Sequence, residues 1–300
     1  MDLYKRASAV AMLNLCSWLK DNRVRFLFLC IGCYVTVKLW PLTSYCMQAE
    51  KTMTPWLLPI LFKSDSVSIN LMKTILHIGM LLLFCNAPFL FPATPYIVLR
   101  SNRSGWWIGE CLYIIEAALI YTVFLAVIAL GIAMPVISFE PDWGTGLREL
   151  MIGNMEQSAE EIRTTYKLYI TPGKMGYYLD PLKTQIYTFL TSWASFSVLG
   201  LLMYLISLLQ RRATIGMIVG GILIFLDPVI YSVNVMRKEK LWIDLLSPVC
   251  WTDAGLLKDI HINNFLTIAI VAGMYVLLIV LLCIGIAMVS RRVIIEATGG

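Results

Sequence analysis

The chain has 300 residues, of which 59% are hydrophobic and only 14% are charged. Length alone would allow two soluble domains, but this composition leaves too few polar side chains for a water-facing surface, so the sequence predicts an integral membrane protein. The formal net charge of +5 gives no indication of nucleic-acid binding. The eight cysteines lie mostly in apolar runs, so a disulfide is conceivable only between cysteines on one outer side, such as Cys46 and Cys250.

Six apolar stretches reach the roughly 20 residues that a helix needs to cross a bilayer core about 30 Å thick. Lipid offers no hydrogen-bond partner to the backbone, and these stretches lack the alternation of barrel strands, so we expect helices. The sequence therefore predicts an all-α protein with six transmembrane helices within residues 26–289. The predicted spans are residues 26–47, 71–91, 107–134, 186–209, 217–235 and 265–289.

Residues 1–25 precede the first span and place an imperfect apolar stripe, which includes Val10 and Leu13, beside Lys5, Arg6 and Lys20. This pattern is typical of an amphipathic helix that lies along the inner membrane surface. A plain cytoplasmic lead-in is the alternative. We expect no cleavable signal peptide, because the first apolar run begins only after 25 residues of charged, helix-forming sequence.

The loop at residues 92–106, between the second and third spans, is short, polar and basic. Pro88, Pro92 and Pro95 are expected to end the second helix, and the stretch RSNRSG at residues 100–105 precedes a new helix at Trp106. Such a segment, held between two spans, is suited to docking a cytosolic protein. The alternative is a positively charged membrane anchor with an aromatic belt.

The loop at residues 135–185 is 51 residues long, which is more than a simple connection requires. Within it, residues 147–167 space apolar side chains at helical intervals among mixed charges and so predict an exposed amphipathic helix. A solvated lid without a ligand is the alternative. Further on, residues 236–264 contain SPVCW at 247–251, and its Pro248 and Trp251 indicate short interfacial or re-entrant pieces.

Lys and Arg are concentrated on one side of the predicted bundle. Residues 1–25, 92–106, 210–216 and 290–300 together carry 11 Lys and Arg and 3 acidic residues over 58 positions. The segments on the other side, 48–70, 135–185 and 236–264, carry 11 Lys and Arg and 13 acidic residues over 103 positions. Positive loops stay in the cytoplasm, so we expect both termini there and the protein in the plasma membrane.

Motifs for catalysis are missing from the sequence. No phosphate-binding loop G-x-x-x-x-G-K-[ST] and no G-x-S-x-G nucleophile motif occur. His77 and His261 are the only histidines, which is too few for a multi-histidine metal site. Cys30 and Cys33 share one helix face without a second pair of ligands, so packing explains them better than metal binding. We therefore expect neither an enzyme nor a metal site.

The chain resembles the permease subunits of bacterial type-2 ABC exporters. The resemblance rests on LRSNRSGWW at residues 99–107 followed by the helix that contains 114–121, on six spans with both ends inside, on the basic N-terminal helix, and on SPVCW before the last span. It covers nearly the whole chain in order. The 51-residue loop is longer than in the smallest members of the family.

This resemblance implies that the transport pathway and the ATPase are separate subunits. In such permeases the first inner loop carries a coupling helix that docks into a separately encoded cytosolic ATPase, which binds ATP and Mg²⁺, and the N-terminal helix contributes to that contact. A second permease subunit, identical or homologous, completes the pathway, and an amphiphilic or hydrophobic substrate such as a peptide, lipid or drug is exported. Carried over by position, the expected coupling residues are Arg100, Asn102, Arg103, Ser104 and Trp106.

Five charged residues fall within the predicted spans. Lys38 and Lys73 are close enough to the outer ends to reach the interface or a partner helix, and Glu110 lies at the inner edge. Glu116 and Asp227 are deeper, where a carboxylate costs several kcal/mol unless it meets water or a partner. Both are candidates to line the transport path, although the helix break at Pro228 offers a structural explanation for Asp227.

Two other functions fit the sequence. An ion-coupled secondary transporter would have two inverted repeats of three spans each, with breaks at Pro88 and Pro228, but the two halves show no sequence similarity. A non-transporting membrane anchor or immunity protein would bind an extracellular peptide through residues 147–167 and would need no energy source.

Overall fold

The computed structural model describes residues 3–63, 71–87, 94–152, 158–168, 179–236, 246–255 and 268–290. Over these residues the regular elements are helices, apart from an isolated β-bridge between Met53 and Ile137. Five helices of the described part are long and apolar enough to cross a membrane, so the chain is an all-α, multi-pass membrane protein. They are α2 (Asn22–Gln48), α5 (Thr94–Ala133), α9 (Pro181–Gln210), α10 (Ala213–Met236) and α12 (Ile268–Ser290).

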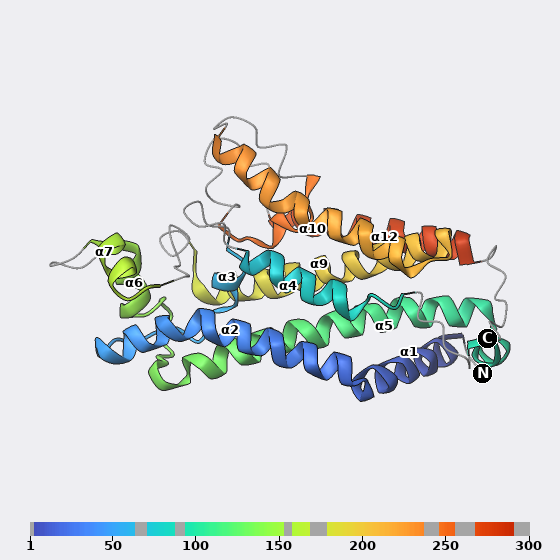
Figure 1. Cartoon of the computed structure of the whole chain (residues 1–300), viewed down its shortest axis with the longest axis horizontal. Helices are drawn as coiled ribbons and strands as arrows, with labels where there is room; N and C mark the ends of the chain where they lie inside the picture. Colours follow the sequence, from blue (N-terminus) through green and yellow to red (C-terminus); the bar gives the residue numbers. More distant parts are fainter. Residues whose placement is uncertain are drawn as a thin grey trace.

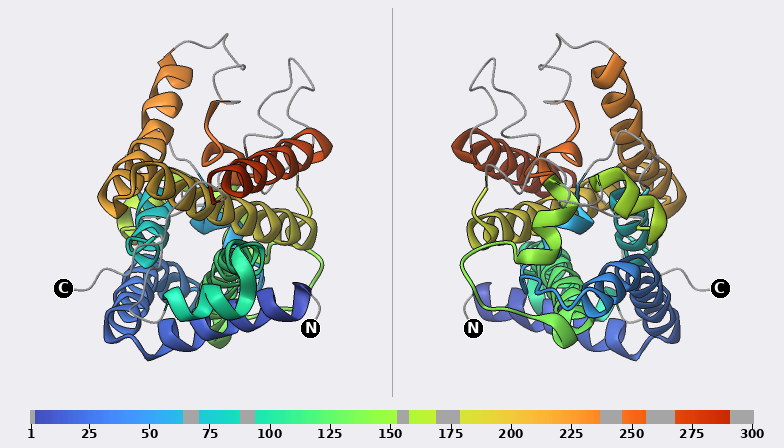
Figure 2. Two further views of the ribbon diagram at one scale, coloured as in Figure 1. Left: turned by 90° about the vertical axis from the view of Figure 1, so that its right-hand side faces the viewer. Right: turned by 90° about the vertical axis from the view of Figure 1, so that its left-hand side faces the viewer.

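The helices form three layers, which the end-on views of Figure 2 separate. One layer holds α1 (Leu3–Lys20), α2 and α5, the middle layer holds α9, α3 (Leu58–Leu61) and α4 (Met72–Leu83), and the third holds α10 and α12. α9 packs against α5 on one side and against α10 and α12 on the other, and 67% of its most apolar stretch is buried. In Figure 1, α6 and α7 mark one end of the bundle and α1 lies toward the opposite end, which we call the α6 end and the α1 end.

The second predicted span, residues 71–91, corresponds to a short helix. The 12 residues of α4 extend about 18 Å, which is too little to cross a bilayer core. The Tyr121 hydroxyl donates to Leu76 O at 3.0 Å, so the first turns of α4 lie level with the middle of the predicted third span. The described residues therefore show a half-length helix that begins at mid-depth, and residues 88–91 lie outside them.

The predicted inner loop at residues 92–106 is mostly helical, which corrects the sequence-based expectation. α5 begins at Thr94 and continues to Ala133 with one non-helical residue, Asn102, at φ 63° and ψ 159°. Pro95, expected to end a helix, lies in the first turn of this one, where a missing backbone N–H is tolerated. Residues 94–101 thus form a short helix that is joined through Asn102 to the long helix of residues 103–133.

Helix α1 packs along the N-terminal half of α5. The two backbones approach closely at Gly109, where an added Cβ would lie 2.6 Å from Val10 Cβ and 2.7 Å from Ala7 O. Next to this contact, Asn14 Nδ2 donates to the buried carboxylate of Glu110 at 2.8 Å. The predicted amphipathic segment is therefore a helix that carries cationic side chains and packs against the bundle.

The predicted segment of residues 1–25 contains a helix boundary. α1 ends at Lys20, and α2 begins at Asn22, earlier than the predicted first span. Asp21 stands between them and caps α2, because its side chain accepts a hydrogen bond from Arg23 N at 2.9 Å. Helix α9 is capped in the same way: the side chain of Asp180 accepts a hydrogen bond from Leu182 N at 3.0 Å.

At the α6 end, the loop of residues 135–185 holds two short helices where the sequence predicted one over residues 147–167. They are α6 (Thr145–Ile152) and α7 (Ala159–Thr165), and residues 153–157 lie outside the described part. Ser158 and Glu161 form a capping box at the start of α7, and the hydrogen bond from the Ser158 N–H lowers the pKa of Glu161.

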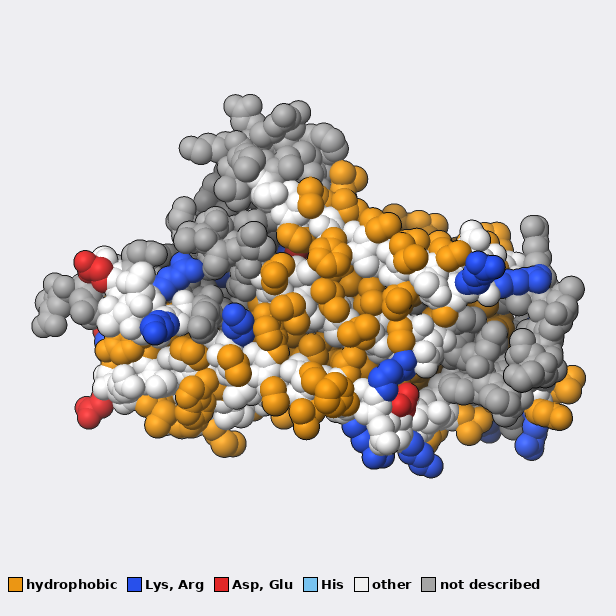
Figure 3. All heavy atoms as spheres, viewed as in Figure 1, with side chains coloured by type: hydrophobic (Ala, Val, Ile, Leu, Met, Phe, Trp, Pro, Cys, Tyr) orange, Lys and Arg blue, Asp and Glu red, His pale blue; other side chains and the backbone are white. Residues whose placement is uncertain are grey.

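Hydrophobic side chains form a broad band across the middle of the face shown in Figure 3, whereas charged side chains gather toward the two ends. Helix α2 alone contributes several exposed hydrophobic side chains to the surface of the bundle: Phe26, Leu29 and Val37 are 68%, 63% and 64% exposed. In water so large an apolar surface would promote association, but lipid tails cover it without penalty. The band is the surface that faces the membrane.

The close approach at Gly109 gives a direct test of α1 packing. We expect Gly109→Ala to lower the melting temperature in detergent and to speed proteolysis within α1, because the new methyl group would overlap Val10 and Ala7. Gly131→Ala in the same helix is the matched control, since nothing lies within 4 Å of its added Cβ. The control should be neutral or stabilising by up to about 1 kcal/mol. Equal behaviour of the two variants would contradict the packing.

Candidate functional site

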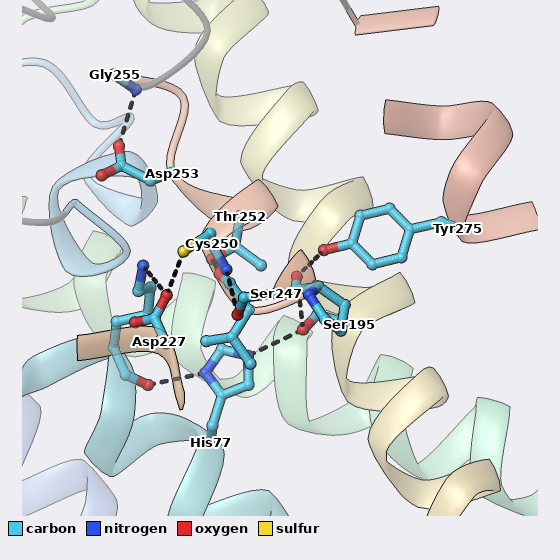
Figure 4. Close-up of polar contacts among 12 residues, drawn as sticks. His77, Ser195, Asp227, Ser247, Cys250, Thr252, Asp253, Gly255 and Tyr275 are labelled. Carbon is cyan, nitrogen blue, oxygen red and sulfur yellow. Dashed lines mark hydrogen bonds and ion pairs between the residues drawn. The ribbon is translucent and has the colours of Figure 1, made fainter. Parts of the chain in front are cut away.

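A buried polar cluster lies where α4, α9, α10 and α12 meet the segment of residues 246–255, as Figure 4 shows. We call residues 246–255 the buried segment, because each side chain from Ser247 to Ala254 is buried. It contains a short 3-10 helix, η3 (Cys250–Thr252), and otherwise irregular backbone. Figures 1 and 2 place it between α10 and α12, which diverge around it.

Lys73 of α4 and Asp227 of α10 form an ion pair at the centre of the cluster. Lys73 Nζ lies 2.9 Å from Asp227 Oδ1, and the two side chains are only 3% and 4% exposed. The thiol of Cys250 donates to the same oxygen at 2.8 Å. A single carboxylate oxygen therefore connects α4, α10 and the buried segment, and each charge compensates the other away from water.

His77 continues the cluster one turn along α4 from Lys73. Its Nδ1 lies 2.8 Å from Lys73 O, and its Nε2 lies 3.0 Å from Ser195 Oγ on α9. A carbonyl oxygen can only accept, so Nδ1 donates to Lys73 O. The hydroxyl of Ser195 also lies 3.5 Å from Pro248 O, to which it donates. His77 and Ser195 thus link α4, α9 and the buried segment.

Two tyrosine hydroxyls supply hydrogen bonds to the irregular backbone of the buried segment. Tyr275 of α12 donates to Pro248 O at 2.5 Å, and Tyr187 of α9 donates to Trp251 O at 2.8 Å. The rings of Trp251 and Tyr275 also meet edge to face, with centroids 5.0 Å apart. These contacts matter because backbone carbonyls at membrane depth need protein partners in place of water.

The sequence identified Asp227 as a candidate but missed its partners. It placed Lys73 near the outer end of a full-length span, whereas α4 begins at Met72 in the middle of the bundle, so Lys73 lies at the depth of Asp227. The available signal was two opposite intramembrane charges, together with His77 one turn from Lys73. Asp227 meets the side chains of Lys73 and Cys250.

Glu116 lies apart from this cluster. It is exposed on α5, on the same face as the exposed Val123 and Val127, and about 9 Å along the helix from Glu110. The carboxylate therefore lies on the surface of the single chain. A path lined by Glu116 would need a second surface to enclose it.

The five residues expected from the permease resemblance divide into two groups at the α1 end. Arg100, Asn102, Arg103 and Ser104 are exposed around the non-helical Asn102. Trp106 is only 2% exposed and belongs to the hydrophobic core. The Trp106 side chain is therefore packed inside the chain, whereas the other four residues lie at its surface.

The backbone at Asn102 is strained. Its φ of 63° with a ψ of 159° falls in a region that only glycine adopts readily, and such a conformation costs about 1–3 kcal/mol. Ser101 supports the bend, since its hydroxyl donates to Ile97 O at 2.8 Å. The short helix of residues 94–101 therefore leaves the axis of α5 at a defined point.

The polar side chains of the cluster are closed off from solvent. Ser195 and His77 are arranged as a hydroxyl and its base, but they are 2% and 0% exposed and the rings of Phe62 and Phe196 flank the imidazole. A substrate cannot reach them in this conformation. Over the described residues, His, Cys, Asp and Glu form no group that could hold a metal ion.

The disulfide considered from the sequence is absent. Cys46 and Cys250 are both reduced: Cys46 lies against Gly146 of α6, and Cys250 contacts Asp227. Each cysteine is therefore held by a different part of the fold.

Comparisons of this chain with protein-family models, with curated proteins and with solved structures gave no match. The fold and the site geometry are therefore the grounds on which its function is inferred.

The ion pair should respond very differently to single and double replacement. Lys73→Ala or Asp227→Ala alone leaves one buried charge unpaired, and we expect either variant to lose about 3–5 kcal/mol of stability. The double variant Lys73→Met/Asp227→Leu removes both charges and should be more stable than either single variant. Thermal unfolding in detergent measures these differences. Lys183→Ala is the control, because its ion pair with Asp180 is exposed and contributes little. Additive losses in the double variant would contradict the pairing.

Proposed function

We propose that the chain is the membrane subunit of an ABC exporter that moves an amphiphilic or hydrophobic substrate out of the cell, driven by a separate ATPase subunit. One observation carries the proposal: a short helix, residues 94–101, is joined through a single non-helical residue to a long membrane helix. Such an element can take up a push from a cytosolic partner and pass it into the membrane as a rigid body.

The surroundings of the short helix support this role. Arg100, Arg103 and Ser104 are exposed at the bend and offer cationic and polar contacts to a partner. Behind them, α1 is packed against α5 at Gly109 and bonded to it through Asn14 and Glu110. A force applied at the bend would therefore move α1 and α5 together.

The proposal fixes a topology and a set of partners. It requires six passes, with α4 and the residues that flank it as the second, both termini in the cytoplasm and the α6 end outside, in the plasma membrane. ATP and Mg²⁺ bind to the cytosolic ATPase subunit. A second permease, identical or homologous, would cover the face of α5 that carries Glu116, where the carboxylate would line the path between the two subunits.

A second candidate, an ion-coupled secondary transporter, is favoured by the position of the ion pair. α4 is a half-length helix and α10 contains Pro228, and they correspond to the second predicted span in each half of the chain. Discontinuous helices that meet at mid-depth are typical of coupling sites in such transporters. This candidate would transport in response to a proton or sodium gradient without any ATPase.

The third possibility, an anchor that binds an extracellular peptide through residues 147–167, finds no support in the packing. Three of its apolar side chains that the structure describes are turned inward: Leu147, Leu150 and Ile162 are 0%, 4% and 1% exposed. They pack in the chain's own core.

Topology is the first test of the proposal. In intact cells, a membrane-impermeant maleimide should modify Arg148→Cys on α6 and should spare Ser104→Cys beside the bend, because both positions are exposed but lie at opposite ends. Both should react after the cells are permeabilised. Mass spectrometry of the two peptides distinguishes them from the natural cysteines. Modification of Ser104→Cys alone in intact cells would reverse the orientation and remove the docking argument.

Coupling is the second test. The wild-type chain, purified from its native membrane in mild detergent, should bring with it a protein that contains a phosphate-binding loop. Arg100→Ala/Arg103→Ala should lower the amount of that protein at least tenfold and leave membrane insertion unchanged, whereas Arg148→Ala at the other end should retain it. If the wild-type chain supports gradient-driven transport without any such protein, the secondary transporter replaces the exporter.

A further inference from the structure

We propose that α10 bends at Asp227–Pro228 during transport and that the contacts of Asp227 with Lys73 and Cys250 are the latch that keeps the bend closed. The inference rests on the proposed transport function, because it assigns a moving part to it. Hinge and latch lie in adjacent residues of one helix, so a change at one acts directly on the other.

The evidence for a hinge is the proline and the unequal packing on its two sides. Pro228 has no N–H to donate to Ile224 O, and its ring crowds the preceding turn, which weakens the helix at that point. Before the proline, Gly216 and Gly220 lie directly against Ser207 and Met203 of α9. Beyond it, Figure 1 shows the C-terminal part of α10 leaving the bundle.

The evidence for a latch is that a single atom makes both closing contacts. Asp227 Oδ1 lies 2.9 Å from Lys73 Nζ and accepts from Cys250 Sγ at 2.8 Å. A rotation of α10 at this turn moves that oxygen away from α4 and from the buried segment together. The contacts therefore break cooperatively, and the closed state persists until a driving force separates the two buried charges.

A continuous set of contacts leads from the proposed docking end to the latch. The long helix of residues 103–133 reaches α4 through Tyr121, whose hydroxyl bonds to Leu76 O, and an added Cβ at Gly79 would meet that hydroxyl at 2.5 Å. Lys73 lies one turn from Leu76 on the same short helix. Movement of α5 thus bears on α4 at the point where α4 holds Asp227.

Opening would release the buried segment from the space between α10 and α12. Asp227 is its partner on α10, while Tyr187 and Tyr275 retain it from α9 and α12. Loss of the α10 contact frees one side of the segment and admits water to Cys250, which is 1% exposed in the closed state. The rate at which a thiol reagent modifies the natural Cys250 therefore reports the opening.

The test measures the rate at which N-ethylmaleimide modifies Cys250 in the full-length chain in lipid nanodiscs, read by mass spectrometry of its peptide. No ATPase or substrate is present, so the result is independent of whether the exporter proposal is right. Three variants are compared with wild type: Lys73→Met/Asp227→Leu without the latch, Pro228→Ala with a stiffened hinge, and Asn14→Leu/Glu110→Leu as the matched control. The control also replaces a buried polar pair by apolar residues, but at the α1–α5 contact.

We expect the latch variant to raise the rate at Cys250 at least tenfold, equivalent to about 1.4 kcal/mol in the opening equilibrium. Pro228→Ala should lower the rate about threefold or more, and the control should stay within about twofold of wild type. A latch variant that reacts no faster than the control overturns the latch, and an unchanged rate in Pro228→Ala overturns the hinge. Pro228→Ala adds a helix hydrogen bond and should fold, so it decides the question alone if the latch variant fails to fold.

Discussion

The ion pair between Lys73 and Asp227 is the contact on which the middle of the bundle depends. α4 is too short to cross a membrane, and the backbone beside it is irregular, so this depth holds polar groups that lipid cannot satisfy. Side chains from four helices supply the partners, and the carboxylate of Asp227 contacts two of the converging elements at once. The arrangement is stable only as a set, because removal of either charge leaves the other without compensation.

Helix α5 connects this centre with the surface at the α1 end. Its first turns carry exposed cationic side chains, its next turns bind α1, and Tyr121 further along contacts α4. A single rigid element thus touches both regions to which we assign a function. The strained Asn102 lies where the short helix departs from this element, so the surrounding contacts hold the angle between them against the cost of the strain.

Composition and apolar run length were sufficient to predict an all-α membrane protein and the approximate positions of α2, α9, α10 and α12. Hydropathy could not predict that α4 stops after 12 residues, because the apolar run continues past the turn at Phe84. That error also hid the partner of Asp227, since a full-length helix would place Lys73 near the outer surface, away from the depth of Asp227. Trp106 shows a different limit: a tryptophan beside a polar loop can be an interface residue or a core residue, and only packing decides between them.

The contact between α1 and α5 also has a consequence for the order of assembly in the cell. Asn14 and Glu110 are 96 residues apart, so α1 leaves the ribosome long before the surface that receives it has been made. At about 5–20 residues per second, that delay is roughly 5–20 seconds. Until then α1 can meet α2, whose Phe28 packs edge to face against Trp18, but it cannot meet α5. Helix α1 is thus synthesised well before it packs against α5.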